Sequence, residues 1–174
     1  MINPFKRSYS EEEINLFRFL SKIKLFESLS YEEMYEFLPH MYLRQYTLDE
    51  VVFFRNDPSN ALYIVKNGKV ALNIDVNDEF QQLTVAKSGE AFGDNAFLSE
   101  TKRVYTSVVV SENAELYVIP QINILEIFDG SVKIKAKVMT SFSELYSDYN
   151  ANLFKAYRHN FGFFDLAQAF ETDA

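Results

Sequence analysis

A glycine, an acidic residue and an arginine are the residues of this chain whose types and spacing point to ligand chemistry. Gly93 and Asp94 share one turn, and Arg103 follows ten positions after the glycine, before a run of β-branched residues. A glycine lets the backbone approach a ligand closely, and the amides of such a turn can point at a phosphate. An arginine can clamp that phosphate with charge-assisted hydrogen bonds, and a carboxylate accepts hydrogen bonds from a sugar hydroxyl. Residues 89–107 therefore predict a cradle for a phosphate and a ribose.

The composition favours a folded domain and argues against catalysis. The chain has 174 residues, of which 48% are hydrophobic and 16% aromatic, so it can bury a core. It has no cysteine, which excludes disulfides and thiolate-bound zinc. Two separate histidines, His40 and His159, supply neither a metal site nor a histidine-based triad, and a cupin-type enzyme would need clustered histidines. We expect no catalytic residue, no metal and no enzymatic activity.

The charge and the hydropathy pattern bear on partners. The formal net charge is −8, whereas a protein that neutralises DNA phosphates needs a basic face. Lys133, Lys135 and Lys137 cluster, and we interpret them as the solvated face of a helix. The N-terminus has no apolar signal region, and no apolar run reaches the roughly 20 residues of a membrane helix. We expect a cytoplasmic protein that contacts neither nucleic acid nor a membrane.

Helices are predicted at the front of the chain and strands after it. Capping-box patterns begin at Ser10 and Ser30, each with a glutamate three positions later. Over residues 69–76 apolar and polar residues alternate, which is typical of a half-buried strand. Short strands follow one another with turn residues between them, which predicts a sandwich, barrel or jelly roll.

The helical period returns after Pro120. We expect a short helix over residues 122–128, an interruption near Gly130 and a long helix from 131 to about 158. Its apolar stripe can pack on its own β domain or on a twin helix in a homodimer, and both alternatives stay open. The apolar tail over residues 161–170 predicts a short docked helix.

The expected organisation has three parts. They are an N-terminal helical segment over residues 1–40, a β domain over 41–120 and C-terminal helices over 121–174.

Residues 25–160 resemble the cyclic nucleotide-binding domain shared by catabolite-activator-type bacterial regulators, kinase regulatory subunits and gated channels. The resemblance rests on the segments 25–30, 49–53, 62–70 and 89–94. Gly68, Gly89 and Gly93 stand where that family has its turn glycines. The resemblance implies a mainly β fold with flanking helices, namely a jelly-roll β-roll followed by a long C-terminal helix.

The resemblance also implies a ligand site, residue by residue. Gly93 matches the glycine of the family's phosphate-binding cassette, Asp94 stands for its ribose-binding glutamate, and Arg103 matches its phosphate-binding arginine. The implied ligand is cAMP or cGMP, with no other cofactor. The candidate ligand-binding residues are Phe92, Gly93, Asp94, Asn95, Ala96, Arg103, Val104 and Tyr105.

The chain departs from the family pattern at several positions. Asp94 is one methylene shorter than glutamate, and Val104 and Tyr105 replace two small residues beside the arginine. A tyrosine that points into the roll would occupy the space of the nucleotide. Asp49 and Asn56 stand near expected glycines, and both residue types tolerate the left-handed backbone of such turns.

The resulting hypothesis is a ligand-sensing regulatory module in which a bound cyclic nucleotide reorients the C-terminal helices. One alternative is another anionic ligand. A second is an occluded roll with a structural or protein-interaction role, in which Arg103 pairs with Asp94 or Glu100. A third is a catabolite-activator-type transcription regulator without its DNA-binding domain, since no basic recognition helix follows residue 158.

Overall fold

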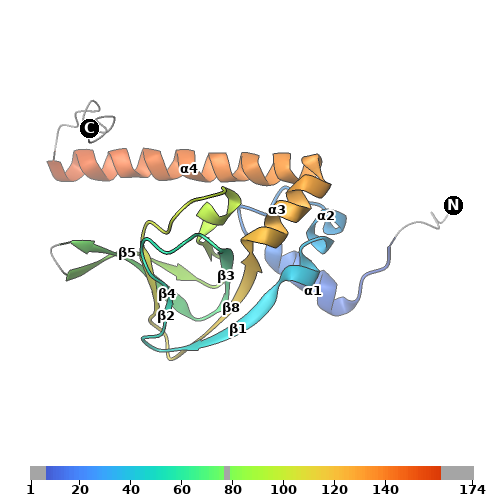
Figure 1. The fold of residues 1–174 in the computed structure, drawn as a ribbon, viewed down its shortest axis with the longest axis horizontal. Coiled ribbons are helices and arrows are strands. Elements are labelled where there is room, and N and C mark those ends of the chain that lie inside the picture. Colours follow the sequence, from blue (N-terminus) through green and yellow to red (C-terminus); the bar gives the residue numbers. More distant parts are fainter. Residues whose placement is uncertain (1–6, 77–78, 162–174) are drawn as a thin grey trace.

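Two antiparallel sheets form a roll that is flanked by helices (Figure 1). The structure, a computed structural model, describes residues 7–76 and 79–161. One sheet has the strand order β1 (Tyr42–Thr47), β8 (Asn113–Pro120), β3 (Ala61–Asn67), β6 (Ala91–Phe92). The other has the order β2 (Val51–Phe53), β7 (Thr106–Val109), β4 (Lys69–Val76), β5 (Glu79–Lys87). The predicted mainly β roll is confirmed, and the strand alternation expected over residues 69–76 is strand β4.

The helices precede and follow the roll, as the capping and periodicity patterns predict. They are α1 (Glu11–Leu20), α2 (Tyr31–Tyr35), η1 (Leu38–His40), α3 (Gln121–Gly130) and α4 (Val132–Phe161), whereas the short η2 (Asp94–Phe97) lies within the roll between β6 and β7. Ser10 and Ser30 both close capping boxes at the starts of α1 and α2. The expected break at Gly130 is present, since α3 ends there and α4 starts two residues later. The final helix predicted from residue 161 onward lies almost entirely outside the described residues.

The core has two parts, separated by the sheet that contains β3. On the outer face of this sheet, Leu62 and Ile64 pack against the helices. On the inner face Val65 joins a cluster that fills the roll. Strand β3 is therefore buried on both faces, because alternate side chains point to opposite sides of a strand.

Helix α4 runs along the whole length of the roll (Figure 1). Residues of its first half, including Ile134, Val138 and Phe142, are buried against its own domain. Beyond that half the apolar stripe is open, with Tyr149 51% and Leu153 63% exposed. The stripe thus packs on its own domain only in part.

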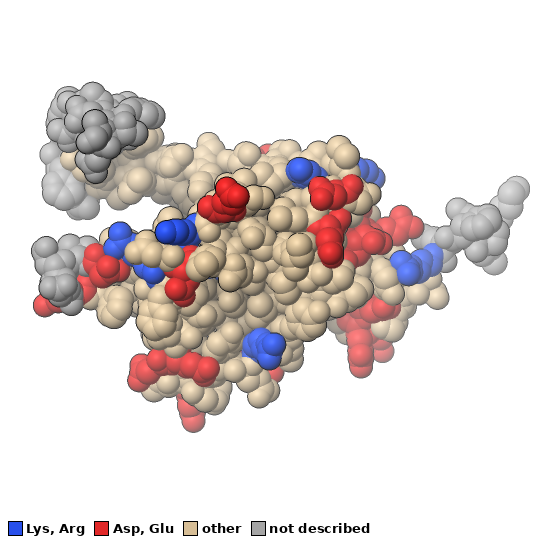
Figure 2. Space-filling view, viewed as in Figure 1, with Lys and Arg blue, Asp and Glu red and all other residues tan. Residues whose placement is uncertain are grey.

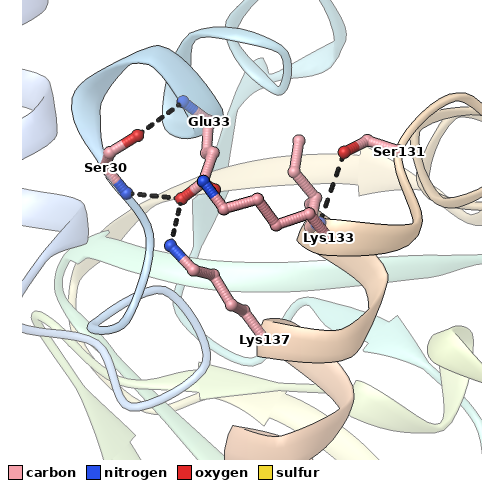
Figure 3. Close-up of polar contacts among 6 residues, drawn as sticks. Ser30, Glu33, Ser131, Lys133 and Lys137 are labelled. Atoms are coloured by element: carbon pink, nitrogen blue, oxygen red, sulfur yellow. Dashed lines mark hydrogen bonds and ion pairs between the residues drawn. The ribbon is translucent and has the colours of Figure 1, made fainter.

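A cluster of charged side chains ties α2 to the start of α4 (Figure 3). The Glu33 carboxylate is buried and lies 2.6 Å from Lys137 Nζ and 3.0 Å from Lys133 Nζ. It also accepts the backbone N–H of the cap residue Ser30 at 2.7 Å. Two of the three lysines interpreted as a solvated face therefore have a carboxylate partner. Burial alone would raise the pKa of the Glu33 carboxyl, but the hydrogen bonds from the lysines and the cap lower it to about 2.

We expect Glu33→Gln to lower the free energy of unfolding by about 2 kcal/mol at neutral pH, since charged hydrogen bonds are lost. A carboxyl with a lowered pKa stabilises the fold above its ordinary pKa of 4.5, and this contribution disappears as the pH falls towards about 2. Urea denaturation of the wild type and the variant should therefore converge over this pH range. The exposed neighbour Glu32→Gln is the matched control, with an expected change within about 0.5 kcal/mol. A difference that persists at pH 2 would contradict this account.

Candidate functional site

The predicted turn lies where β6 ends and η2 begins. Gly93 has a left-handed backbone with a φ of 75°, which favours glycine. A Cβ at this position would lie 2.7 Å from Nη1 of Arg103 and 3.3 Å from the carbonyl oxygen of Ala61. The backbone of this turn therefore passes directly against the arginine, as the spacing of the two residues predicts.

Arg103 is only 3% exposed and points at the turn. Its Nη1 donates to the Gly93 carbonyl at 2.8 Å, and its Nη2 donates to the Ala61 carbonyl at 2.6 Å. The guanidinium carbon lies 4.2 Å from the centre of the Phe53 ring. The buried Nε has no hydrogen-bond partner among the described residues. Burial lowers the pKa of the Arg103 guanidinium, because the charge has left water.

No carboxylate of the described residues forms an ion pair with Arg103. The occluded alternative expected an ion pair between Arg103 and Asp94 or Glu100, and the structure has neither of these ion pairs. The guanidinium binds two backbone carbonyls instead. Asp94 acts on the buried positive charge only from beyond ion-pair distance.

Asp94 is the second residue of the turn and is 7% exposed. Burial raises the pKa of its carboxyl, against the lowering effect of backbone hydrogen bonds and of Arg103. The same carboxylate lies near α4, since after burial it is the largest cause of the raised pKa values of Tyr146 and Tyr149. Helix α4 thus places two tyrosines within electrostatic reach of the acidic residue of the turn.

Tyr105 points into the roll, and Val104 points away from it. The Tyr105 hydroxyl accepts the backbone N–H of Gly93 at 2.9 Å. Its ring centre lies 5.6 Å from that of Phe53. Val104 is 58% exposed at the surface, so the structure does not bring it to the site.

The other predicted residues line the turn without facing the arginine. Phe92 is buried inside the roll and stacks on Tyr63 at 5.2 Å. Ala96 is fully buried, and the carbonyl of Asn95 accepts a hydrogen bond from Thr101. The structure therefore brings together five of the eight candidates, namely Phe92, Gly93, Asp94, Arg103 and Tyr105.

Three contact residues of the arginine were missed. Phe53, Tyr63 and the Ala61 carbonyl all lie within reach of Arg103. The alternation within strand β3 was a usable signal, since it places Tyr63 on the face opposite to Leu62 and Ile64. No periodicity marks Phe53, and a backbone carbonyl has no signature in a sequence.

A cavity of about 590 Å³ adjoins the turn. Its walls include Leu72 and Ala86 of the roll, the segment 89–91 that leads into the turn, and Leu145 and Tyr149 of α4. The segment 22–25 that follows α1 forms a further wall, so the cavity lies between the roll, this segment and α4, and neither Asp94 nor Arg103 lines it. Its largely apolar walls suit a planar organic group.

The sequence of this region decides the family. The family model of the cyclic nucleotide-binding domain matches residues 43–131, about half of the 174-residue chain. The chain belongs to the cyclic nucleotide-binding domain family. The matched residues include the whole turn from Phe92 to Tyr105.

Individual proteins are similar to this domain over part of their length. The cyclic AMP receptor protein of Thermus thermophilus is 33% identical over 93 residues, which are 53% of this chain and 43% of that protein. The chain thus covers less than half of that relative.

Solved structures share the fold. The cAMP-bound regulatory domain of Toxoplasma gondii PKA has a TM-score of 0.63 at 23% identity, covering 70% of this chain and 46% of that one. The N-terminal domain of a Streptomyces coelicolor transcriptional regulator has a TM-score of 0.68 at 19% identity, covering 78% and 94%.

The described parts of the chain, residues 7–76 and 79–161, contain no group of three or more His, Cys, Asp or Glu side chains that could hold a metal ion. None of their helices is long and apolar enough to cross a membrane. On the face shown in Figure 2, lysines and arginines lie in separate spots among acidic residues, without a continuous basic surface.

Proposed function

We propose that this domain is a non-enzymatic sensor that binds a cyclic nucleotide, cAMP or cGMP, between the turn at Gly93 and helix α4. The observation that carries the proposal is the buried Arg103, which has no carboxylate partner and an unpartnered Nε. Burying an ion costs several kcal/mol, and two carbonyl hydrogen bonds supply no opposite charge. A phosphate on the guanidinium would supply it.

The neighbouring groups suit the remaining parts of such a ligand. Asp94 follows Gly93 directly and can accept a hydrogen bond from a ribose hydroxyl. The adjoining cavity of about 590 Å³ offers Leu72, Ala86 and Tyr149 to the faces of a base. Phosphate, sugar and base would then follow one another from the arginine towards α4.

The same turn is mechanically connected to the C-terminal helices. The Phe97 ring of η2 packs edge-on against Phe142 of α4 at 5.6 Å and lies 6.0 Å from Phe128 of α3. Gln121 at the start of α3 donates to the carbonyls of Ala96 and Leu98. A ligand that moves the turn would therefore move α3 and α4, which is how we propose that the signal leaves the roll.

A homodimer through α4 is part of this proposal. Tyr149 and Leu153 are more than half exposed on the second half of the helix, where its own domain leaves the apolar stripe open. A second copy could cover this stripe.

Isothermal titration calorimetry with cAMP and cGMP tests the proposal, with 5′-AMP as a control that lacks the cyclic phosphate. We expect binding heat and a higher melting temperature for at least one cyclic nucleotide, since a ligand stabilises the folded state that binds it. If millimolar cyclic nucleotide gives no binding heat and no change in melting temperature, the proposal is wrong.

One observation favours a second candidate function. The donors of the turn are already engaged, because Tyr105 accepts the Gly93 amide and two carbonyls hold Arg103. A roll that stays closed in this way would be a structural or protein-interaction module. The calorimetric experiment separates the two candidates.

A further inference from the structure

We propose that Tyr105 is a gate of the ligand site: its hydroxyl takes the place of a ligand oxygen at the Gly93 amide, and a ligand enters only when this side chain leaves the roll. This inference rests on the proposed function and specifies how the site is regulated. The carrying observation is the hydrogen bond of 2.9 Å from Gly93 N to the Tyr105 hydroxyl oxygen.

The hydroxyl and a ligand phosphate compete for the same position. The Gly93 N–H belongs to the turn that faces Arg103, since Nη1 of the arginine binds the carbonyl of the same glycine. One N–H makes one strong hydrogen bond, so a phosphate oxygen and the tyrosine oxygen exclude each other.

The ring of Tyr105 also belongs to the aromatic cluster on which the arginine lies. Both residues contact Phe53. The centre of the Phe53 ring lies 5.6 Å from the Tyr105 ring centre and 4.2 Å from the guanidinium carbon of Arg103. Tyr63 and Phe92 complete this aromatic packing around Phe53. Withdrawal of one ring from such a cluster opens a volume next to the cation.

The closed arrangement leaves polar groups inside the roll without partners. Arg103 Nε is one, and the hydroxyl of Ser107 is another, with an exposed fraction of 0%. Ser107 is paired across the strands with Phe53 and Leu72, which both belong to the inner cluster, so its side chain faces the inside. Buried polar groups without partners destabilise the state that contains them. A polar ligand that supplies partners to these groups would therefore favour the open state over the closed one.

Two variants and one control test the gate. Tyr105→Phe removes only the hydroxyl and should lower the Kd for cAMP or cGMP about fivefold, since a net hydrogen bond is worth about 1 kcal/mol. Tyr105→Ala also removes the ring and should lower the Kd further. Tyr117→Phe changes a tyrosine on the helix side of the sheet and should leave the Kd unchanged.

A second measurement needs no ligand. In the free protein, Tyr105→Phe should shift the NMR resonance of the Gly93 amide and speed its hydrogen exchange, because the N–H loses its acceptor. Tyr117→Phe should do neither. An unchanged Gly93 amide in Tyr105→Phe would overturn the gate.

The binding outcomes separate the gate from the function on which it rests. If the wild type binds a cyclic nucleotide and both Tyr105 variants bind it equally well, the gate is wrong and the proposed function stands. If Tyr105→Ala binds and the wild type does not, the gate holds, and the proposed function fails for the wild-type protein because its site stays shut. If no variant binds, both proposals fail.

Discussion

Replacing Arg103 with glutamine is expected to weaken binding of a cyclic nucleotide at least a hundredfold. Two unit charges about 4 Å apart attract each other by roughly 4 kcal/mol at an effective dielectric constant of 20. Losing even two thirds of this attraction corresponds to about a hundredfold in affinity. Glutamine also lacks the planar fork that binds a phosphate through two parallel hydrogen bonds.

The same substitution should leave the fold largely intact. Glutamine removes a buried charge whose burial opposes folding, but its shorter side chain leaves the carbonyls of Gly93 and Ala61 without the arginine donors, so the two effects on stability oppose each other. Calorimetry should therefore show lost binding, while thermal unfolding should show a modest change in melting temperature.

Arg55→Gln is the matched control for Arg103→Gln. Arg55 belongs to the same roll, but its guanidinium is exposed and pairs with Asp75 at 2.9 Å. The control loses the same charge, so it reports the effect of net charge alone, and we expect unchanged affinity. If Arg103→Gln binds as tightly as this control, the phosphate is bound elsewhere and the proposed site is wrong.

Gly68→Ala is expected to lower the free energy of unfolding by about 3 kcal/mol. Gly68 joins β3 to β4 with a φ of 90°, and a left-handed backbone costs a residue with a Cβ about 1–2 kcal/mol. The added Cβ would lie 2.6 Å from the Asn113 carbonyl oxygen and 2.7 Å from the Ala114 Cα, both backbone atoms of the neighbouring strand β8. Relieving such an overlap costs about 1–3 kcal/mol more.

Gly89→Ala separates the two contributions. Gly89 has a similar φ of 85°, but a Cβ there would meet nothing within 4 Å. It should therefore lose only the backbone contribution of about 1–2 kcal/mol. Urea denaturation of both variants measures the difference, and equal losses would show that the approach to β8 costs nothing.

The turns and helix starts were predictable because they depend on neighbouring residues. Both capping boxes form as their spacing predicts, with Ser30 and Glu33 exchanging hydrogen bonds three residues apart. Asp49 and Asn56 adopt φ values of 66° and 70°, so the left-handed turns expected at these two positions are confirmed. In each case the deciding atoms lie within a few residues of chain.

The partners of the charged residues were not predictable in this way. Lys137 reaches a carboxylate 104 positions earlier, and Arg103 reaches the Ala61 carbonyl 42 positions earlier. Residue types show that a cation needs a partner, but only the packing of α2 against α4, or of β3 against the turn, brings the partner within hydrogen-bond distance.

The direction of Tyr105 is the clearest case of this division. By itself the sequence determined the β-roll, its left-handed turns and the proximity of Gly93, Asp94 and Arg103, because strand period, turn chemistry and short spacing are local properties. It showed that a tyrosine follows the arginine, and it left open whether the ring points in or out. Only the tertiary structure decided that question. The inward position depends on the ring of Phe53, which is far away in the sequence, and on the Gly93 amide, which donates to the hydroxyl.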